Sequence, residues 1–155
     1  MIRLMPDVTL PPSPFDGLLG TEWISSDPDK AIARLPMKDD HRQPMGIMHG
    51  GVMASLVESL CSMATATAVV PENKVAMGQA ISVNLLRPVS KGGIEVEAEA
   101  IHRGRMSWVW RATIKDFEGR TCALAQMTMA VRDAPDGIDL GFLVSEKEDE
   151  APAAG

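Results

Sequence analysis

The sequence predicts an α+β domain in which an antiparallel sheet wraps around one long helix, and three observations support this. Residues 51–70 are small and apolar with scattered Ser and Thr, as expected for a centrally buried helix. Four segments with strand patterns follow that helix, and a hairpin pattern precedes it. A sheet with one hydrophobic face can cover a single helix.

The elements before the helix are short. Residues 1–14 are rich in proline and indicate an extended arm, which leads to a helical turn around Phe15–Leu19. The segments TEWISS and KAIARLP predict two strands joined by a turn at DPD. Residues 37–48, MKDDHRQPMGIM, show no periodicity and predict a loop that leads into the long helix. Pro71 predicts the end of that helix.

Four strands are predicted after the helix. The segment QAISVNLLRPV places Ile81, Val83 and Leu85 on one face, and GGIEVEAEAIH alternates apolar residues with glutamates. MSWVWRATIKDF and RTCALAQMTMAVRD complete the run, and turns at SKGG, RGR and DFEG predict an antiparallel meander. Trp108 and Trp110 are at strand spacing, so we expect them to pack together in the core or at an interface.

The composition is that of an ordinary globular domain. Hydrophobic residues make up 45% and charged residues 23% of the 155 residues, which argues against disorder over most of the chain. We expect one domain over residues 1–145 and disorder in the charged tail, residues 146–155. The formal net charge of −6 gives no overall attraction to nucleic acid or to anionic membranes. Any polyanionic ligand therefore requires a local basic cluster.

The cysteines and the N-terminal sequence favour a cytoplasmic protein. Cys61 and Cys122 fall inside a predicted helix and a predicted strand, which indicates buried reduced thiols. The start, MIRLMPDV, reaches a proline and an acid before a secretory-type apolar core is formed. No apolar run is judged to reach the roughly 18 to 20 residues of a membrane span, so no membrane association is expected.

The stretch GIMHGGVMASLVESL, residues 46–60, contains the main candidate catalytic residues. Backbone N–H groups at a helix start have no intrahelical partner, and glycines there let an oxygen with developing negative charge approach closely. A carboxylate inside an apolar helix, here Glu58, is costly to bury, and burial raises its pKa toward the range useful in catalysis. From the residues alone, Glu58 could also be a structural acid, and HGG could be a plain junction between loop and helix.

The pattern Q-P-x-G-x-x-H-G-G followed by an acid resembles the hotdog-fold acyl-CoA thioesterases of the phenylacetate-degradation and 4-hydroxybenzoyl-CoA branch. The resemblance also takes in VNLLRPV and HRGRMSWVWRATIKDFEGR, and it runs from about Phe15 to Arg132. It implies a hotdog fold and hydrolysis of a small, medium or aryl acyl-CoA to the free acid and CoA. The only ligand implied is the acyl-CoA substrate, with no separate cofactor and no metal.

The resemblance also implies roles for individual residues. Glu58 matches the catalytic acid, as general base or nucleophile, and the Gly50 N–H matches the donor that polarises the thioester carbonyl. His49 would hold that loop in place, and Gln43 would position the water or the carbonyl. Ser62, one helical turn after Glu58, matches a position where the family often has a hydroxyl.

Helix geometry makes a dimer necessary for this chemistry. Glu58 lies nine residues after His49 (58 − 49 = 9), about 13 Å along a regular helix and roughly half a turn around it. The two residues cannot serve one carbonyl from a single chain. The family's solution is a homodimer in which the helix start of one subunit faces the acid of the other. We therefore expect composite active sites in a dimer, and a dimer of dimers as in many relatives.

A basic cluster is needed for the phosphates of CoA. The candidates are close to strand ends, and the RGR turn resembles the nucleotide-binding region of the family. The alternative is that these charged residues are solvated and bind no ligand, as most charged residues in turns are. The candidate CoA-binding residues are Arg87, His102, Arg103, Gly104, Arg105 and Ser107.

Two further kinds of site, a metal site and a cysteine nucleophile, are disfavoured by the sequence. Asp39, Asp40, His41 and His49 lack a recognisable metal-ligand spacing. Cys61 lies near Glu58, but a buried thiol without a lowered pKa is inert.

Two other functions stay open beside thioester hydrolysis. The first is an acyl-thioester hydratase or dehydratase on the same fold, and the second is a non-catalytic acyl-CoA-binding protein. The HGG motif with an acid nine residues on favours hydrolysis, and the presence of Glu58 and Gln43 disfavours a mere binder. The absence of Tyr from the sequence disfavours a dedicated hydroxyaryl enzyme.

Overall fold

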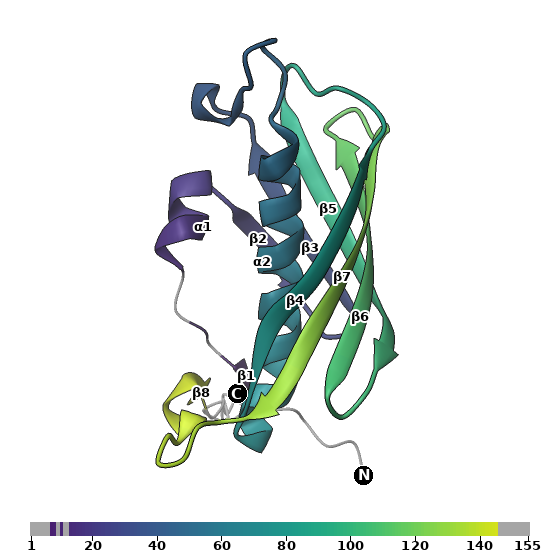
Figure 1. Cartoon of the computed structure of the whole chain (residues 1–155). Coiled ribbons are helices and arrows are strands. Elements are labelled where there is room, and N and C mark those ends of the chain that lie inside the picture. Colours follow the sequence, from purple (N-terminus) through teal and green to yellow (C-terminus); the bar gives the residue numbers. More distant parts are fainter. Residues whose placement is uncertain (1–6, 9, 11–12, 146–155) are drawn as a thin grey trace, which may run out of the picture.

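The computed structural model describes Asp7–Val8, Leu10 and residues 13–145. Its central element is the 20-residue helix α2, which packs against a six-stranded antiparallel sheet (Figure 1). The strands are β1 Asp7–Val8, β2 Glu22–Ser26, β3 Lys30–Pro36, β4 Lys74–Leu85, β5 Gly93–Arg103, β6 Ser107–Asp116, β7 Thr121–Asp133 and β8 Val144–Ser145. The helices are α1 Pro14–Leu19 and α2 Gly50–Val69, with 3-10 turns η1 Asp39–His41, η2 Val70–Glu72 and η3 Leu140–Leu143.

The order of strands in the sheet is β2-β3-β5-β6-β7-β4, which confirms the hairpins but not the full meander. Strands β5, β6 and β7 follow one another, whereas β4 pairs with β7 at the far edge and β3 pairs with β5. The predicted four-stranded meander is therefore wrong for its first strand. Ion pairs from Arg34 to Glu95 (3.3 Å) and from Lys30 to Glu97 (3.1 Å) join β3 to β5. The alternating pattern of β4 shows which face is apolar but does not specify the neighbouring strand.

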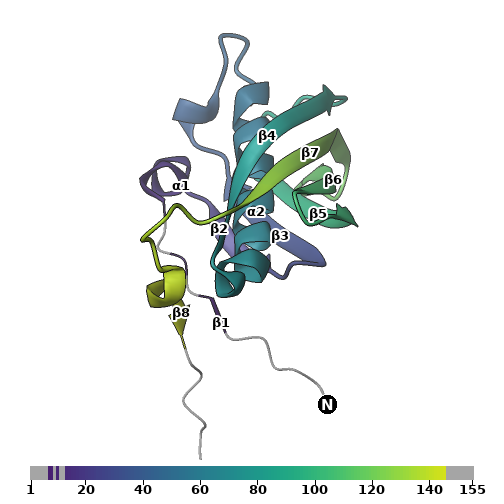
Figure 2. The same ribbon diagram turned by 60° about the horizontal axis from the view of Figure 1, so that its bottom comes forward.

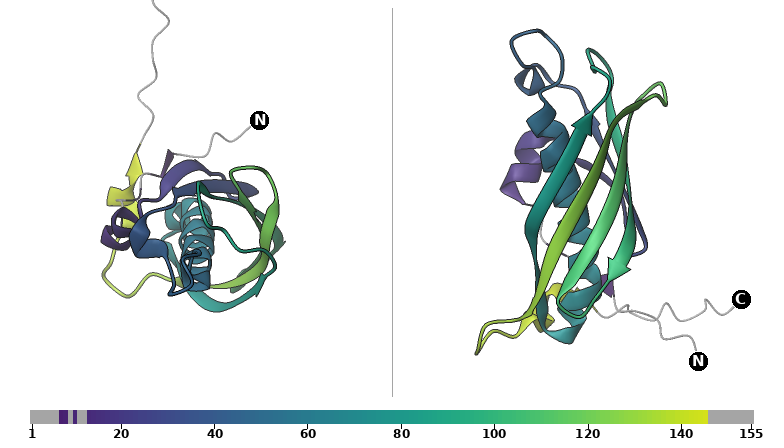
Figure 3. Two further views of the ribbon diagram at one scale, coloured as in Figure 1. Left: turned by 90° about the horizontal axis from the view of Figure 1, so that it is seen from above. Right: turned by 45° about the vertical axis from the view of Figure 1, so that its right-hand side comes forward.

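The core lies between the inner face of the sheet and one face of α2. Viewed along the helix, the sheet curves around it (Figure 3). Leu56, Val57 and Leu60 of α2 are fully buried against this face. Trp108 and Trp110 are both buried with ring centroids 6.2 Å apart, which confirms their packing in the core.

Helix α1 lies on the side of α2 away from the sheet (Figures 1 and 3). Ser13 caps its start, since the hydroxyl accepts the N–H groups of Phe15 (3.2 Å) and Asp16 (3.4 Å), and Gly20 ends it with a φ of 80°. The predicted helical turn is thus confirmed. Glycine fits this left-handed position because it carries no Cβ.

Two short strands join the ends of the described chain. Within the expected N-terminal arm, β1 pairs with β8, and Figure 2 shows them side by side below the sheet. The side chain of Asn73 holds the segment before β8 by accepting the Leu140 N–H (3.0 Å) and donating to the Ile138 carbonyl (3.3 Å). The tail predicted to be disordered, residues 146–155, lies outside the described residues.

Residues Gly50–Glu72 are long and apolar enough to span a membrane by length and composition, with a mean hydropathy of 1.5 over the best window. The statement that no apolar run has this length is therefore wrong. In the fold, this segment is the central helix, and 44% of the window is buried. A core helix of this kind passes the same composition test as a spanning helix.

Candidate active site

The start of α2 leaves one backbone donor free. His49 is the N-cap residue, and its Nδ1 accepts the Gly51 N–H at 2.9 Å. The Gly50 N–H has no acceptor among the residues that the structure describes. A Cβ on Gly50 would collide with a terminal methyl of Leu85 on β4, so a larger residue there would displace this exposed side chain. The helix start therefore presents the Gly50 N–H as a ready donor for an oxygen with negative charge.

The loop before the helix is held by its own hydrogen bonds. The Gln43 Oε1 accepts the Met45 N–H at 2.5 Å, and the Gln43 N–H donates to the Ile47 carbonyl at 2.9 Å. The His49 N–H donates to the carbonyl of buried His41 at 2.8 Å. In this arrangement the side chain of Gln43 shapes the loop, and the role expected for it toward water or the carbonyl stays a prediction.

Glu58 is exposed in this chain, so the expectation of a buried acid is wrong for a single subunit. The reason is that it lies across α2 from the buried residues Leu56 and Leu60, beside β4, the edge strand of the sheet. No hydrogen bond or ion pair to its carboxylate is found within the described part of the chain. The carboxylate lies over Gly78 of β4, where an added Cβ would be only 2.8 Å from Oε1. Gly78 thus makes room for the acid.

Ser62 lies one helical turn after Glu58, as expected, and is partly buried. Its hydroxyl contacts the sulfur of Met129 at 3.8 Å, and Met129 pairs with Gly78 across β4 and β7. Gly50 and Glu58 lie eight residues apart on one helix (58 − 50 = 8), which corresponds to about 12 Å. A single chain therefore places Glu58 and Ser62 near each other but keeps both away from the Gly50 N–H.

The expected basic cluster is not assembled within one chain. Arg87 follows β4 near the start of α2, whereas the RGR turn joins β5 to β6 at the opposite end of the sheet (Figure 1). Lys74, at the first position of β4, lines a pocket with Arg105 of that turn. Leu85 comes eleven residues later (85 − 74 = 11), or about 36 Å along the strand. The sequence pattern could not show this because every candidate is close to a strand end.

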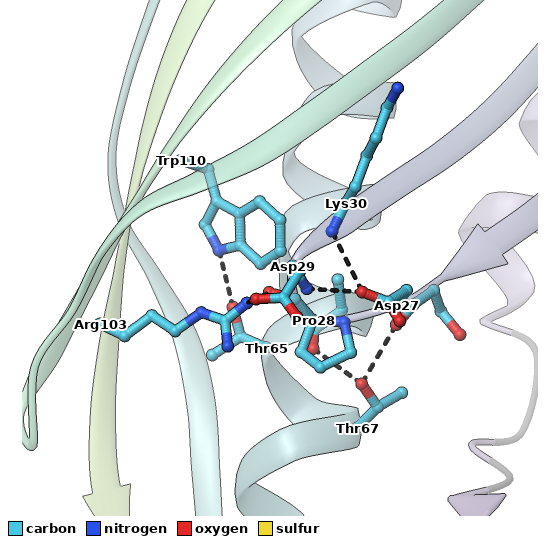
Figure 4. Close-up of polar contacts among 10 residues, drawn as sticks. Asp27, Pro28, Asp29, Lys30, Thr65, Thr67, Arg103 and Trp110 are labelled. Carbon is cyan, nitrogen blue, oxygen red and sulfur yellow. Dashed lines mark hydrogen bonds and ion pairs between the residues drawn. The ribbon is translucent and has the colours of Figure 1, made fainter.

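Arg103 is already engaged in structural contacts (Figure 4). Its guanidinium donates to the carbonyl of Pro28 and to the carboxylate of Asp29, and it stacks 4.9 Å from the ring of Trp108. His102 and Arg105 are exposed, and the Gly104 N–H closes the turn by donating to the Ser107 carbonyl at 2.8 Å. Of this group, Arg105 is the residue that lines a pocket.

That pocket has a volume of about 330 Å³ and is rich in positive charge. It contains Lys74 and Arg132, which the sequence analysis missed. Both residues stand at strand ends. The register of β4 on β7 brings Lys74 beside Arg132, and the Arg132 guanidinium reaches the turn by donating to the Met106 carbonyl at 2.8 Å. To predict from the sequence that Lys74 and Arg132 lie near Arg105, one would need to know the order of the strands in the sheet. The pocket is lined by Lys74, Arg105, Met106, Val131, Arg132 and Asp133.

The cysteines are buried and free, as predicted. Burial raises the pKa of the Cys61 thiol to about 12, so this group stays protonated and does not serve as a nucleophile. Among the described residues, no group of three His, Cys, Asp or Glu side chains is placed to hold a metal ion. Hydrolysis without metal stays a prediction.

Comparison with known proteins agrees with this geometry. Residues 45–123 match the model of the Thioesterase superfamily. The proofreading thioesterase EntH of Cronobacter turicensis is 34% identical over 113 residues, covering 73% of this chain and 82% of EntH. The 1,4-dihydroxy-2-naphthoyl-CoA hydrolase of Listeria monocytogenes is 32% identical over 114 residues, covering 74% and 92%.

Solved thioesterase structures have the same architecture. A variant of thioesterase PA1618 from Pseudomonas aeruginosa superposes with a TM-score of 0.72 at 32% identity, covering 76% of this chain and 84% of that one. Thioesterase HI1161 from Haemophilus influenzae gives 0.74 at 28% identity, covering 86% and 99%. The fold is the hotdog fold, as predicted. The chain belongs to the thioesterase superfamily, and it is a thioester hydrolase.

Proposed function

We propose that the protein hydrolyses acyl-CoA thioesters in composite sites, where the Gly50 N–H of one subunit binds the thioester oxygen and Glu58 of the other acts on the carbonyl carbon. The observation that carries this proposal is the free Gly50 N–H beside a capped Gly51 N–H. One such donor is worth about 3 kcal/mol of transition-state stabilisation. The exposed Glu58 carboxylate supplies the second half of the chemistry.

Two routes start from this arrangement. As general base, Glu58 takes a proton from water while the water oxygen adds to the carbonyl carbon, and the carbon–sulfur bond then breaks to release CoA. As nucleophile, Glu58 forms a mixed anhydride and displaces CoA, and water then cleaves the anhydride. In both routes the Gly50 N–H stabilises the negative oxygen, and the helix dipole adds to this effect.

The free edge of β4 is the surface we propose for dimer formation. Within the described chain, β4 pairs only with β7, and the side chains of Met77, Ile81 and Leu85 stay exposed. No charged residue occurs between Lys74 and Arg87. A long apolar edge without charge is a strong template for pairing with another strand. Antiparallel pairing of β4 with its copy would extend the sheet.

The two halves of the site indicate the register of that pairing. Gly78 lies under Glu58, and Leu85 lies against Gly50. If Leu85 faces Gly78 of the partner subunit, the bulge between Gly78 and Ala80 makes Asn84 face the partner's Ala80. The two-fold axis then passes between the two copies of Ser82. This register brings the acid of one subunit to the helix start of the other.

The same register would assemble the basic cluster. Because the pairing is antiparallel, the start of β4 in the partner subunit, with Lys74 and its pocket, would lie toward the end of β4 and Arg87 of the first subunit. Three cations from one subunit and one from the other could then bind the phosphates of CoA. Pairing of two dimers into a tetramer, and the cytoplasmic location, stay predictions.

Mixing two inactive variants tests the composite site. Glu58→Gln removes the acid and Gly50→Pro removes the amide hydrogen, so each alone should lose at least about a hundredfold in kcat for thiol release from acyl-CoA. In a mixed dimer, one site would keep both groups. After subunit exchange, a random mixture should recover about a quarter of wild-type activity, because half of the dimers carry one intact site of two.

The controls make the result decisive. Glu99→Gln changes an exposed acid on the outer face of the sheet and should keep full activity. Sedimentation should show that each variant is dimeric and that the subunits exchange. A mixture that exchanges but stays inactive contradicts the composite site. Full activity of Glu58→Gln by itself contradicts the catalytic role of the acid.

A further inference from the structure

A second pocket adjoins the free amide at the start of α2. It has a volume of about 340 Å³ and lies between this helix start and the end of β4. Met53, three residues after Gly50, is buried on the same side of the helix. Apart from Gly50 and Arg87, the lining residues are all apolar. The full lining is Ile47, Met48, Gly50, Met53, Leu85, Leu86, Arg87 and Pro88.

Several backbone polar groups of this pocket are already bonded elsewhere. The Met48 N–H donates to the Val89 carbonyl at 2.7 Å, and the N–H groups of Leu86 and Arg87 both donate to the Cys122 carbonyl. The Ile47 carbonyl accepts the Gln43 N–H at 2.9 Å. The donors that remain in this chain's lining include the Gly50 N–H and the exposed guanidinium of Arg87. The interior of the pocket therefore offers little to a polar ligand.

We infer that this pocket binds the acyl group of the substrate, and that Met53 and Leu86 select apolar, unsubstituted acyl chains. This inference rests on the proposed function. A thioester bound through its oxygen to the Gly50 N–H extends in two directions from the carbonyl carbon. The pantetheine arm carries amides and a hydroxyl, which would lose their hydrogen bonds to water in this pocket without replacement. An aliphatic acyl chain loses nothing there and gains from burial.

The chemistry of the lining determines the expected specificity. Each methylene that enters the pocket should raise kcat/KM about fourfold until the pocket is full. A hydroxyl on the buried part of the acyl chain should lower kcat/KM about 10- to 100-fold, because the one polar side chain of the lining, Arg87, is exposed to solvent and the other lining side chains are apolar. The preferred substrate class is thus an aliphatic acyl-CoA of short to medium length, with hydroxyaryl thioesters disfavoured.

Two variants change the size of the pocket in opposite directions. Leu86→Trp adds volume at a position whose side chain is 60% exposed, so the fold should tolerate it. It should move the best chain to a shorter length. Met53→Ala empties space deep in the pocket and should move the best chain to a longer length. Leu124→Trp is the matched control, since Leu124 is exposed on β7 and pairs with Asn84 outside the pocket.

The experiment compares two readings for each protein. The first is kcat/KM for butanoyl- to dodecanoyl-CoA, with 6-hydroxyhexanoyl-CoA beside hexanoyl-CoA. The second is the Kd of S-alkyl-CoA thioethers of the same lengths, which contain no cleavable carbonyl. We expect both profiles to shift with Leu86→Trp and Met53→Ala and to stay unchanged in Leu124→Trp. Circular dichroism should confirm that each variant is folded.

The outcomes separate this inference from the proposed function. If the wild type cleaves no thioester but the thioether profile shifts with the variants, hydrolysis is wrong and the acyl pocket stands. If Leu86→Trp changes affinity by the same factor at every length, the pocket holds part of CoA and the inference is overturned. Equal kcat/KM for the hydroxylated and plain hexanoyl substrates would also overturn it.

Discussion

The two faces of α2 differ in how they are closed. Toward the sheet, Leu56, Val57 and Leu60 are fully buried, and polar Thr65 is buried with its hydrogen bonds made. On the opposite face, Glu58 is exposed and has no partner in the described chain. The difference shows that the two faces of one helix serve different purposes. The sheet side supplies stability, and the open side is left for a partner and a substrate.

Leu60→Ala should have the largest effect on stability. The side chain is fully buried, so its truncation leaves a cavity and should cost about 2 to 5 kcal/mol in the free energy of unfolding. Urea unfolding followed by circular dichroism measures this loss. Glu58→Gln, two residues away on the open face, should change it by less than about 0.5 kcal/mol. A loss above 2 kcal/mol in Glu58→Gln would break the division between the faces.

Thr65→Val tests the polar part of the closed face. Trp110 Nε1 donates to the Thr65 hydroxyl at 3.0 Å (Figure 4). This hydroxyl donates to the Cys61 carbonyl at 2.7 Å. Valine would leave the indole N–H buried without an acceptor, which costs about 1 to 3 kcal/mol in thermal or urea unfolding. Adding Trp110→Phe removes the orphaned donor. The double variant should therefore be less destabilised than the sum of the two single variants.

Gly78→Ala should act mainly on Glu58, beside the edge strand β4. The new Cβ would lie 2.8 Å from Glu58 Oε1 and 2.9 Å from Met127 Cε, so the flexible ends of both side chains must shift. Displacement of the acid should lower kcat about tenfold, or about 1.4 kcal/mol, with little change in the urea midpoint. Ala80→Ser on the same strand is the control. An unchanged kcat in Gly78→Ala would show that the position of Glu58 over Gly78 does not matter for the reaction.

The contrast between the faces also explains what sequence patterns could predict. Hydrophobic period and turn residues were sufficient for α1, α2 and the main strands, because these signals are local. The position of β4 beside β7 was not predictable in this way, since alternation does not specify a neighbour. Glu58 was found through the motif that contains it, but its exposure was not. An apolar helix pattern does not show which face the same chain leaves uncovered.

The cationic pocket illustrates the same limit. Arg105 could be identified from the RGR turn, whereas Lys74 and Arg132 carry no local signal and meet it only through the pairing of β4, β7 and β6. The role of Gly78 could not be predicted from the sequence either, because it consists of leaving space for the Glu58 side chain from α2. Residues whose function arises from long-range packing require the structure.

Asp116 gives the smallest expected effect and extends the comparison to a second acid. Unlike Glu58, it is buried, and its carboxylate accepts the N–H groups of Glu118 (3.0 Å) and Arg120 (2.9 Å) and the Arg120 guanidinium (2.7 Å). Burial by itself raises the pKa of Asp116, but the hydrogen bonds from Arg120 and Glu118 outweigh it and hold this pKa below the usual value.

A lowered pKa in the folded state means that Asp116 stabilises the fold above the ordinary carboxyl pKa and loses this contribution as pH falls through the folded value. We therefore expect Asp116→Asn to lower the urea midpoint at pH 7. The gap between wild type and variant should narrow as the pH falls below about 4, near the ordinary aspartate pKa. A gap that widens on acidification would contradict the assignment of this stabilisation to the ionised Asp116 carboxylate.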